Sequence, residues 1–255
     1  MRTKEFHENS GSEFGKRVLE MEPEKERIAE AVLKYALWQE ALDPKNPIFL
    51  SDGSSASYVW CHYLRAWAKN GPAGEALIVK TNNLDVPMQV LCEPGAHGRV
   101  NIEDAPGDFS FKFCANFGSD TDAWVEKKCS GCTCILAVTS LDAELGPGSK
   151  DPRARAIKRA VMETANVLVI VADRTKLSKP RNPADAANPN AWKIWRDQRA
   201  NEGRLFVVTD QSPEVTHPYK RTPFKGFPDA RTPLQIENEN TWWLREHLGK
   251  QFIVV

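Results

Sequence analysis

Five short polar clusters in this 255-residue chain carry side chains that can hold a phosphate group and hydroxyl groups. Each follows an apolar run, and they are Asp52-Gly53-Ser54-Ser55, Thr81-Asn82-Asn83, Thr139-Ser140-Leu141-Asp142, Asp173-Arg174-Thr175-Lys176 and Thr209-Asp210. Ammonium and backbone N–H groups bind phosphate, while carboxylates and amides bind hydroxyl groups. Each cluster alone also has a structural explanation, because serine, threonine, asparagine and aspartate are ordinary turn and N-cap residues. Five clusters together favour a site for a small phosphorylated polyol.

The first cluster has the composition of a phosphate-binding turn. Gly53-Ser54-Ser55 lies between the apolar run 48–50 and a helix predicted over residues 55–69. A helix start offers backbone N–H groups and the positive end of its dipole to an anion. We expect Lys176 to supply positive charge and the following residues to bind sugar hydroxyls: Asp52, Asn83, Asp142 and Asp173.

The runs before these clusters predict the strands that position them. Strands are expected at 48–50, 76–79, 133–138, 167–171, 205–208 and 252–255, with shorter ones near 100–102 and 109–113. Helices are expected at 22–38, 55–69, 84–92, 120–128, 152–165, 190–201 and 234–248. Runs of Val, Ile and Leu without alternation indicate strands buried on both faces. The chain is therefore predicted to be an α/β protein with a mostly parallel, Rossmann-like sheet and helices on both faces, whose ligand lies at the carboxyl ends of the strands.

The chain is predicted to form a single domain over residues 22–255. Residues 1–21 are mostly polar and are expected to be an N-terminal tail. Residues 211–233 contain prolines spaced by five and are expected to be an inserted Pro-rich loop. Its basic and aromatic part, 219–227, suits either a plain surface loop or a lid or docking segment for a protein partner.

Charge, hydropathy and cysteine usage argue against nucleic-acid-binding, membrane, secreted and metal-binding proteins. The 34 basic residues balance the 34 acidic ones, which disfavours direct nucleic-acid binding. No apolar run approaches the roughly 20 residues of a membrane span, and the polar N-terminus is not a secretory signal, so a cytoplasmic location is expected. Cys129, Cys132 and Cys134 have metal-like spacing, but the last begins an apolar strand; we expect reduced thiols, no metal and no cofactor.

The motifs, in this order, resemble the sensor domain of DeoR-type regulators. The stretch Ile48–Ser55 is similar to that family's Ile-x-Leu-Asp-x-Gly-Thr-Thr, which follows a helix with an Ile-Ala pair, here Ile28-Ala29. Residues 79–83 resemble its Val-x-Thr-Asn-Ser, 171–176 its Ala-Asp-x-Ser-Lys, and 207–210 its Ile-Thr-Asp. The resemblance covers residues 24–255 but not the family's winged helix-turn-helix, for which the residues before Glu22 are too few.

The resemblance implies a sugar isomerase/CoA-transferase-like fold, binding of a sugar phosphate and a homo-oligomer. The binding residues that it implies are Asp52, Gly53, Ser54, Ser55, Thr81, Asn82, Asp142, Lys158, Asp173 and Lys176. Two alternatives remain open. One is an aldose–ketose isomerase-like enzyme, with Asp142 or Asp173 as the base and Lys158 or Lys176 stabilising an enediolate. The other is a protein-interaction module with a degenerate pocket, docking through residues 211–233.

Overall fold

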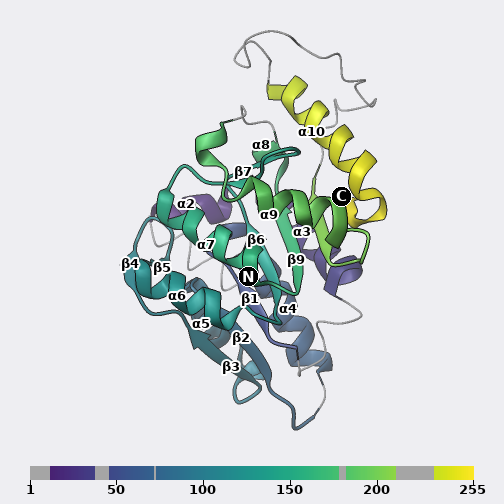
Figure 1. The fold of residues 1–255 in the computed structure, drawn as a ribbon. Helices are drawn as coiled ribbons and strands as arrows, with labels where there is room; N and C mark the ends of the chain where they lie inside the picture. Colours follow the sequence, from purple (N-terminus) through teal and green to yellow (C-terminus); the bar gives the residue numbers. More distant parts are fainter. Residues whose placement is uncertain (1–11, 38–45, 72, 178–181, 211–232) are drawn as a thin grey trace.

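The computed structural model describes residues 12–37, 46–71, 73–177, 182–210 and 233–255 (Figure 1). It contains the predicted α/β architecture, a seven-stranded sheet with helices on both faces. All six neighbouring strand pairs in this sheet are parallel. The predicted fold class is therefore confirmed.

The direction in which successive strands are added to the sheet reverses next to β1 (Ile48–Leu50). The strands are β1 (Ile48–Leu50), β2 (Leu77–Thr81), β3 (Val100–Asp104), β6 (Thr133–Ala137), β9 (Val167–Ala172), β10 (Leu205–Thr209) and β11 (Phe252–Val254), and their order in the sheet is β11-β10-β9-β6-β1-β2-β3. The chain moves outward from β1 to β3, returns to β6 and then continues outward the other way. In open parallel sheets, such a switch point leaves a crevice at the carboxyl ends of the two central strands, here β1 and β6.

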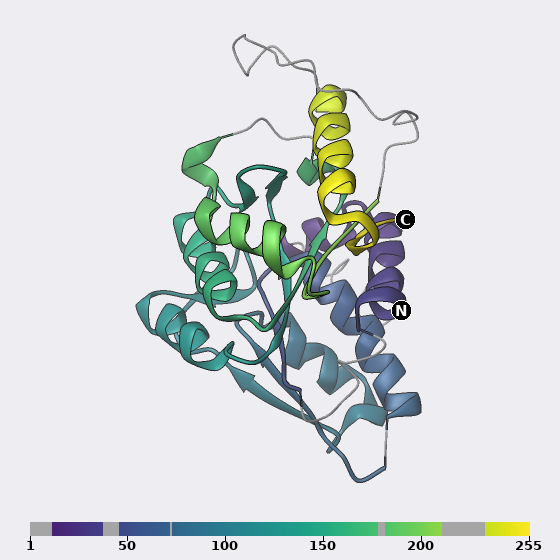
Figure 2. The ribbon, with the colours of Figure 1, turned by 45° about the vertical axis from the view of Figure 1, so that its right-hand side comes forward.

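Helices cover both faces of this sheet, as Figure 2 shows. One face packs against α3 (Glu22–Ala31), α4 (Ser54–Asn70) and α5 (Asp85–Cys92), and the other against α6 (Ser119–Lys128), α7 (Pro152–Thr164), α9 (Pro189–Ile194) and α10 (Pro233–Leu248). Single π-helical segments extend α3 (Val32–Leu37) and α9 (Trp195–Arg199). Short 3-10 helices lie at Pro94–Ala96, Pro183–Asp185 and Gly249–Gln251.

Side-chain alternation divides the core into two layers. In β9, Leu168 and Ile170 pack with α7 and α9, whereas Val169 and Val171 pack with α3 and α4. All six residues of this strand are buried, which is why its sequence lacks polar alternation. The three cysteines of the 129–134 segment are free thiols, buried in the layer between the sheet and the α7–α9 side.

The structure differs from expectation at the N-terminus. Within the predicted tail, α2 (Glu13–Leu19) is a helix that buries Phe14 and Val18. These residues are four apart and share one face of the helix, but a seven-residue helix has too weak a pattern to stand out in the sequence. Its existence depends on packing against the rest of the molecule.

Two antiparallel hairpins interrupt the α/β alternation. One pairs β4 (Asp108–Ser110) with β5 (Ala115–Phe117), where a single strand was expected near 109–113. The other pairs β7 (Ser140–Asp142) with β8 (Gly146–Gly148), so Asp142 lies in a strand where a strand-end cluster was expected. A short α8 (Arg174–Leu177) follows β9.

The Pro-rich loop expected at 211–233 lies outside the described residues, apart from its last position, where α10 begins. Among the helices that the structure describes, none has both the length and the apolar character needed to cross a membrane.

Candidate functional site

Two adjoining cavities lie at the carboxyl ends of the strands, at the switch point between β1 and β6. The smaller, of about 60 Å³, is lined by residues that follow β1 and β6, including Asp52, Gly53 and Val138. The larger, of about 730 Å³, extends beside the β7–β8 hairpin. Arg17, Phe113 and Thr139 line both, so the two spaces meet at these side chains.

The N-terminus of α4 forms one wall of the smaller cavity. Gly53 precedes the helix at φ 117°, a backbone conformation that side-chain-bearing residues rarely adopt, and as a glycine it has no side chain with which to cap the helix. A Cβ atom at Gly53 would lie 2.9 Å from the Ala137 Cβ. The turn therefore brings the start of α4 close to β6. Within the described part of the chain no side chain caps its first N–H groups, which favours an anion there.

Lys158 places a buried positive charge at this wall. The residue is 2% exposed, and its Nζ lies 3.5 Å from Asp52 Oδ1, close enough for an ion pair. The contact lacks hydrogen-bond geometry, so Asp52 Oδ1 has no hydrogen-bond partner among the described residues. The hydrogen bond of Lys158 Nζ to Ala154 O is long, at 3.5 Å. A buried ammonium ion normally has several close acceptors, so Lys158 retains capacity to bind an anion.

Arg17 of α2 is a site residue that sequence reasoning missed. Its Nη2 atom is buried and has no hydrogen-bond partner in the described part of the chain. Burial lowers the pKa of Arg17, opposed by the charges of Glu13 and Asp52. The guanidinium carbon lies 4.9 Å from the centroid of the Phe113 ring. Ser12, which caps α2, and the Phe14–Val18 spacing were the available sequence signals.

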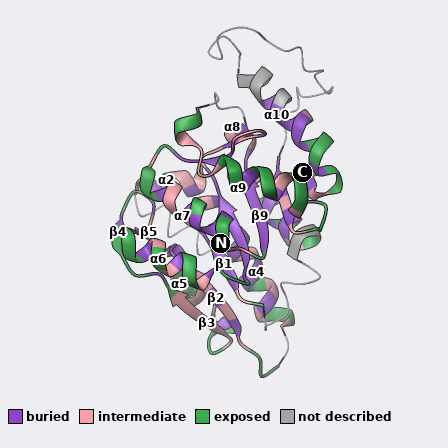
Figure 3. Ribbon diagram, in the orientation of Figure 1, coloured by how far each residue is buried: buried purple, intermediate pink, exposed green. Residues whose placement is uncertain are grey.

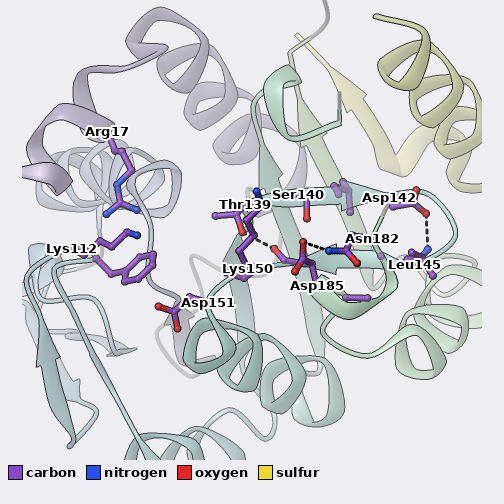
Figure 4. Close-up of a pocket in the computed structure, with 16 residues that line it drawn as sticks. Arg17, Lys112, Thr139, Ser140, Asp142, Leu145, Lys150, Asp151, Asn182 and Asp185 are labelled. Atoms are coloured by element: carbon purple, nitrogen blue, oxygen red, sulfur yellow. Dashed lines mark hydrogen bonds between the residues drawn. The ribbon is translucent and has the colours of Figure 1, made fainter. Parts of the chain in front are cut away.

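The larger cavity has mixed charge, and several of its carboxylates are already bound. Figure 4 shows Arg17 and Lys112 on one side, across from Thr139, Ser140 and Lys150. Asp142 Oδ1 accepts hydrogen bonds from the backbone N–H groups of Glu144 and Leu145, both at 2.8 Å.

Asp185 and Asp151 of the same cavity also have partners. Asp185 Oδ2 accepts from Asn182 Nδ2 at 2.9 Å, and Asp151 pairs with Arg153. The lysines and Arg17 are therefore the groups available to an anionic ligand.

Thr81, Asn82 and Asn83 line neither cavity and instead hold the turn after β1. Asn82 Oδ1 accepts from Asp52 N at 3.0 Å, and Thr81 Oγ1 donates to Leu50 O at 2.8 Å. Asn83 Nδ2 donates to Ser57 Oγ at 3.1 Å. These three side chains are fully buried, so their place in the structure is that of positioning residues.

In the cluster 173–176 after β9, one residue lines the smaller cavity and the others stabilise the loop that carries it. Lys176 lines the smaller cavity, where its Nζ lies 3.6 Å from Asp173 Oδ2. Asp173 lines neither cavity; its Oδ1 accepts hydrogen bonds from the backbone N–H and hydroxyl of Thr175. Asp210, which follows β10, forms an ion pair with Arg174, with 2.7 Å between Asp210 Oδ2 and Arg174 Nη1. This ion pair stabilises the segment after β9.

Of the predicted residues, the structure brings together one group at the smaller cavity: Asp52, Gly53, Ser54, Ser55, Lys158 and Lys176. Asp142 lies in the larger cavity.

Comparison with known proteins gave matches only among solved structures, since no family model and no curated protein matches the chain. A ribose-5-phosphate isomerase from Methanocaldococcus jannaschii is 11% identical, with a TM-score of 0.39, and the alignment covers 61% of this chain and 54% of that one. The enzyme from Plasmodium falciparum is 13% identical, with a TM-score of 0.36, over 59% and 52% of the two chains.

A third match is a ribose-5-phosphate isomerase in complex with phospho-erythronic acid. It is 11% identical, with a TM-score of 0.39, over 60% of this chain and 52% of that one. The alignments thus span about half the length of the solved structures that the chain matches.

Proposed function

We propose that this protein binds a small phosphorylated metabolite, a sugar phosphate, in the two strand-end cavities, and that it acts as a sensor module in the manner of DeoR-type domains. The observation that carries this proposal is the buried Lys158 ammonium group beside the uncapped start of α4. A fixed positive charge and free backbone N–H groups at one point form an anion site.

The sizes of the cavities suggest how the ligand is divided between them. About 60 Å³ leaves room for a few heavy atoms, so the smaller cavity suits the phosphate group. The larger, at about 730 Å³, has the volume of a small-molecule site and suits the sugar. Arg17 lies where they meet, so its unpartnered Nη2 atom would bind the phosphate.

The positions of the carboxylates favour binding over turnover. An isomerase requires a base over the carbon next to the carbonyl. Asp142 is turned toward backbone donors of its own hairpin, and Asp173 lies outside both cavity linings. Of the two candidate bases, Asp142 is therefore the one that lines a cavity, and its Oδ1 is held by its own hairpin, which supports the sensor over the isomerase.

The test is a calorimetric titration of the protein with ribose 5-phosphate and glucose 6-phosphate. The unphosphorylated sugars and inorganic phosphate are the ligand controls. Arg17→Ala is the site variant, and Lys16→Ala, an exposed neighbour on the same helix, is its matched control. A hydrogen bond between charged groups contributes about 1.5–3 kcal/mol, so Arg17→Ala should weaken binding roughly tenfold or more.

Four outcomes are informative. Saturable binding of a sugar phosphate that Arg17→Ala weakens and Lys16→Ala does not supports the site. If the unphosphorylated sugar binds as tightly as the sugar phosphate, the phosphate group is not recognised. If none of the probes binds, the proposal is contradicted. Conversion of the bound sugar phosphate, followed by NMR of the ligand, would favour the isomerase instead.

A further inference from the structure

A separate cavity of about 450 Å³ lies between α3, α4 and α5, and it shares no lining residue with the strand-end cavities. Its lining includes Glu22, Glu26, Tyr58, His62, Asp85 and Gln89. The cavity lies on the sheet face covered by these three helices, whereas β7 and β8 line the larger strand-end cavity.

The electrostatics of this cavity favour a cation. Three carboxylates line it against one guanidinium, that of Arg65. Burial lowers the pKa of His62, and Arg65 lowers it further, which favours the neutral imidazole. Burial, together with the charges of Glu22 and Glu26, raises the pKa of Tyr58, so its hydroxyl stays neutral.

The wall of the cavity contains an unsatisfied acceptor. Gln89 is 4% exposed, and its Nε2 donates to Asp85 Oδ2 at 2.6 Å and to Ser57 O at 3.2 Å. Its Oε1 is left without a hydrogen-bond partner among the described residues. Asp85 is itself 2% exposed, so a buried carboxylate and a buried amide stand side by side in the lining. Such groups favour an occupant with N–H donors.

The spacing of the carboxylates favours an organic cation over a metal ion. Glu22 and Glu26 lie one turn apart on α3, whereas Asp85 comes from the first turn of α5. Within the described ranges, no three His, Cys, Asp or Glu side chains converge closely enough to hold one metal ion. Dispersed carboxylates around a cavity of this volume suit a ligand whose own charges are dispersed.

We infer that the cavity between α3, α4 and α5 is a second ligand site, which takes an organic diamine or polyamine. Asp85 binds one ammonium group at the buried end, Glu22 and Glu26 bind another at the rim, and the Tyr58 ring lies along the aliphatic part. This inference does not depend on the strand-end site.

The test is a calorimetric titration with 1,4-diaminobutane, with 1,4-butanediol as the uncharged control and MgCl2 as the metal control. Glu26→Gln is the rim variant, and Glu30→Gln, an exposed residue on the same helix outside the cavity, is its matched control. Asp85→Asn tests the buried end. Exposed ion pairs are weak, so Glu26→Gln should lower the diamine affinity about two- to fivefold, and Asp85→Asn should lower it about tenfold or more.

Saturable binding of the diamine alone, weakened by Asp85→Asn and Glu26→Gln but not by Glu30→Gln, supports the site. If Glu30→Gln lowers the diamine affinity as much as Glu26→Gln does, the diamine responds only to the negative charge of the surface, and the proposal is overturned. Equal binding of the diol, tighter binding of Mg²⁺, or no saturable diamine binding at millimolar concentration would also overturn it. Circular dichroism of each variant separates loss of the site from loss of the fold.

Discussion

Lys158 and Asp52 form an ion pair that solvent barely reaches. The side chains are 2% and 5% exposed, and the shortest nitrogen–oxygen distance is 3.5 Å. Burying two charges costs free energy, which their attraction offsets only while both are present. The pair therefore contributes to the proposed anion site and also affects the free energy of unfolding. Variants can separate its effect on ligand binding from its effect on stability.

Lys158→Met should lower the free energy of unfolding by about 3–5 kcal/mol, because it leaves the buried Asp52 carboxylate unpaired. The double variant Lys158→Met/Asp52→Asn should recover most of that loss, since neither charge then remains. Urea denaturation measures both. Sugar-phosphate binding should be weakened about tenfold or more in the double variant although it folds, and full binding by it would show that Lys158 does not hold the ligand.

Lys25 is a second buried lysine, and its pKa is lowered to about 8. Burial is the main cause, opposed by the charge of Asp173. Its Nζ donates to the carbonyl oxygens of Arg17, Val18 and Glu20, so it holds the C-terminal end of α2 to α3.

This shift predicts how stability depends on pH. Between about pH 8 and 10.5, the unfolded chain keeps a proton on Lys25 that the native protein releases, so Lys25 adds stability as the pH rises through that window. The slope from this one group is at most about 1.4 kcal/mol per pH unit. The measurement is the difference in unfolding free energy between wild type and Lys25→Met across the window. A difference that does not change with pH would place the pKa of Lys25 near its ordinary value.

At the scale of the elements, the β7–β8 hairpin forms a wall of the larger cavity and depends on one tight contact. Gly146 begins β8 at φ 79°, and a Cβ atom there would lie 2.5 Å from Trp192 Cγ. Trp192 is buried, and its Nε1 donates to Ala143 O at 3.0 Å within the same hairpin. The tryptophan thus fixes the position of the hairpin on α9.

Gly146→Ala should destabilise the protein much more than Gly131→Ala. Both glycines have nearly the same φ, 79° and 77°, but no atom of the described residues lies within 4 Å of a Cβ atom at Gly131. The control therefore reports backbone strain alone, of order 1 kcal/mol, and the collision with Trp192 should add about 1–3 kcal/mol. Thermal denaturation of the pair measures the difference. Equal melting temperatures would mean that the hairpin moves away from Trp192 without loss of stability.

At the scale of the whole molecule, the sheet is most protected at its centre. The residues of β6 and β9 are all buried, whereas β3 at one edge is partly exposed (Figure 3). Local opening requires less free energy where fewer apolar contacts must break.

Native-state hydrogen exchange should follow this gradient. Amides of β6 and β9 should exchange only through global unfolding, and those of β3 should exchange earlier through local opening. The measurement is exchange by mass spectrometry at increasing urea. Slow exchange throughout β3 would indicate that something covers this edge, for which a second copy of the chain, expected from the family resemblance, is one candidate.

The sequence by itself determined the strands of the seven-stranded sheet and the longer helices that cover it, because buried parallel strands are continuous apolar runs and amphipathic helices repeat every 3.6 residues. It also indicated the turn at Asp52–Ser55 and two lysines, 158 and 176, that the structure places at one cavity. These signals are local, and a single segment of chain contains each of them.

The tertiary structure decided which of the polar residues face a ligand. Thr81, Asn82 and Asn83 have the same composition as a binding cluster, but their hydrogen bonds go to β1, α4 and the β5 strand. Arg17 reaches the site only because α2 folds back over it, held by Lys25. Whether a polar side chain binds the backbone or a ligand depends on groups far away in the chain, so packing settles it and local pattern does not.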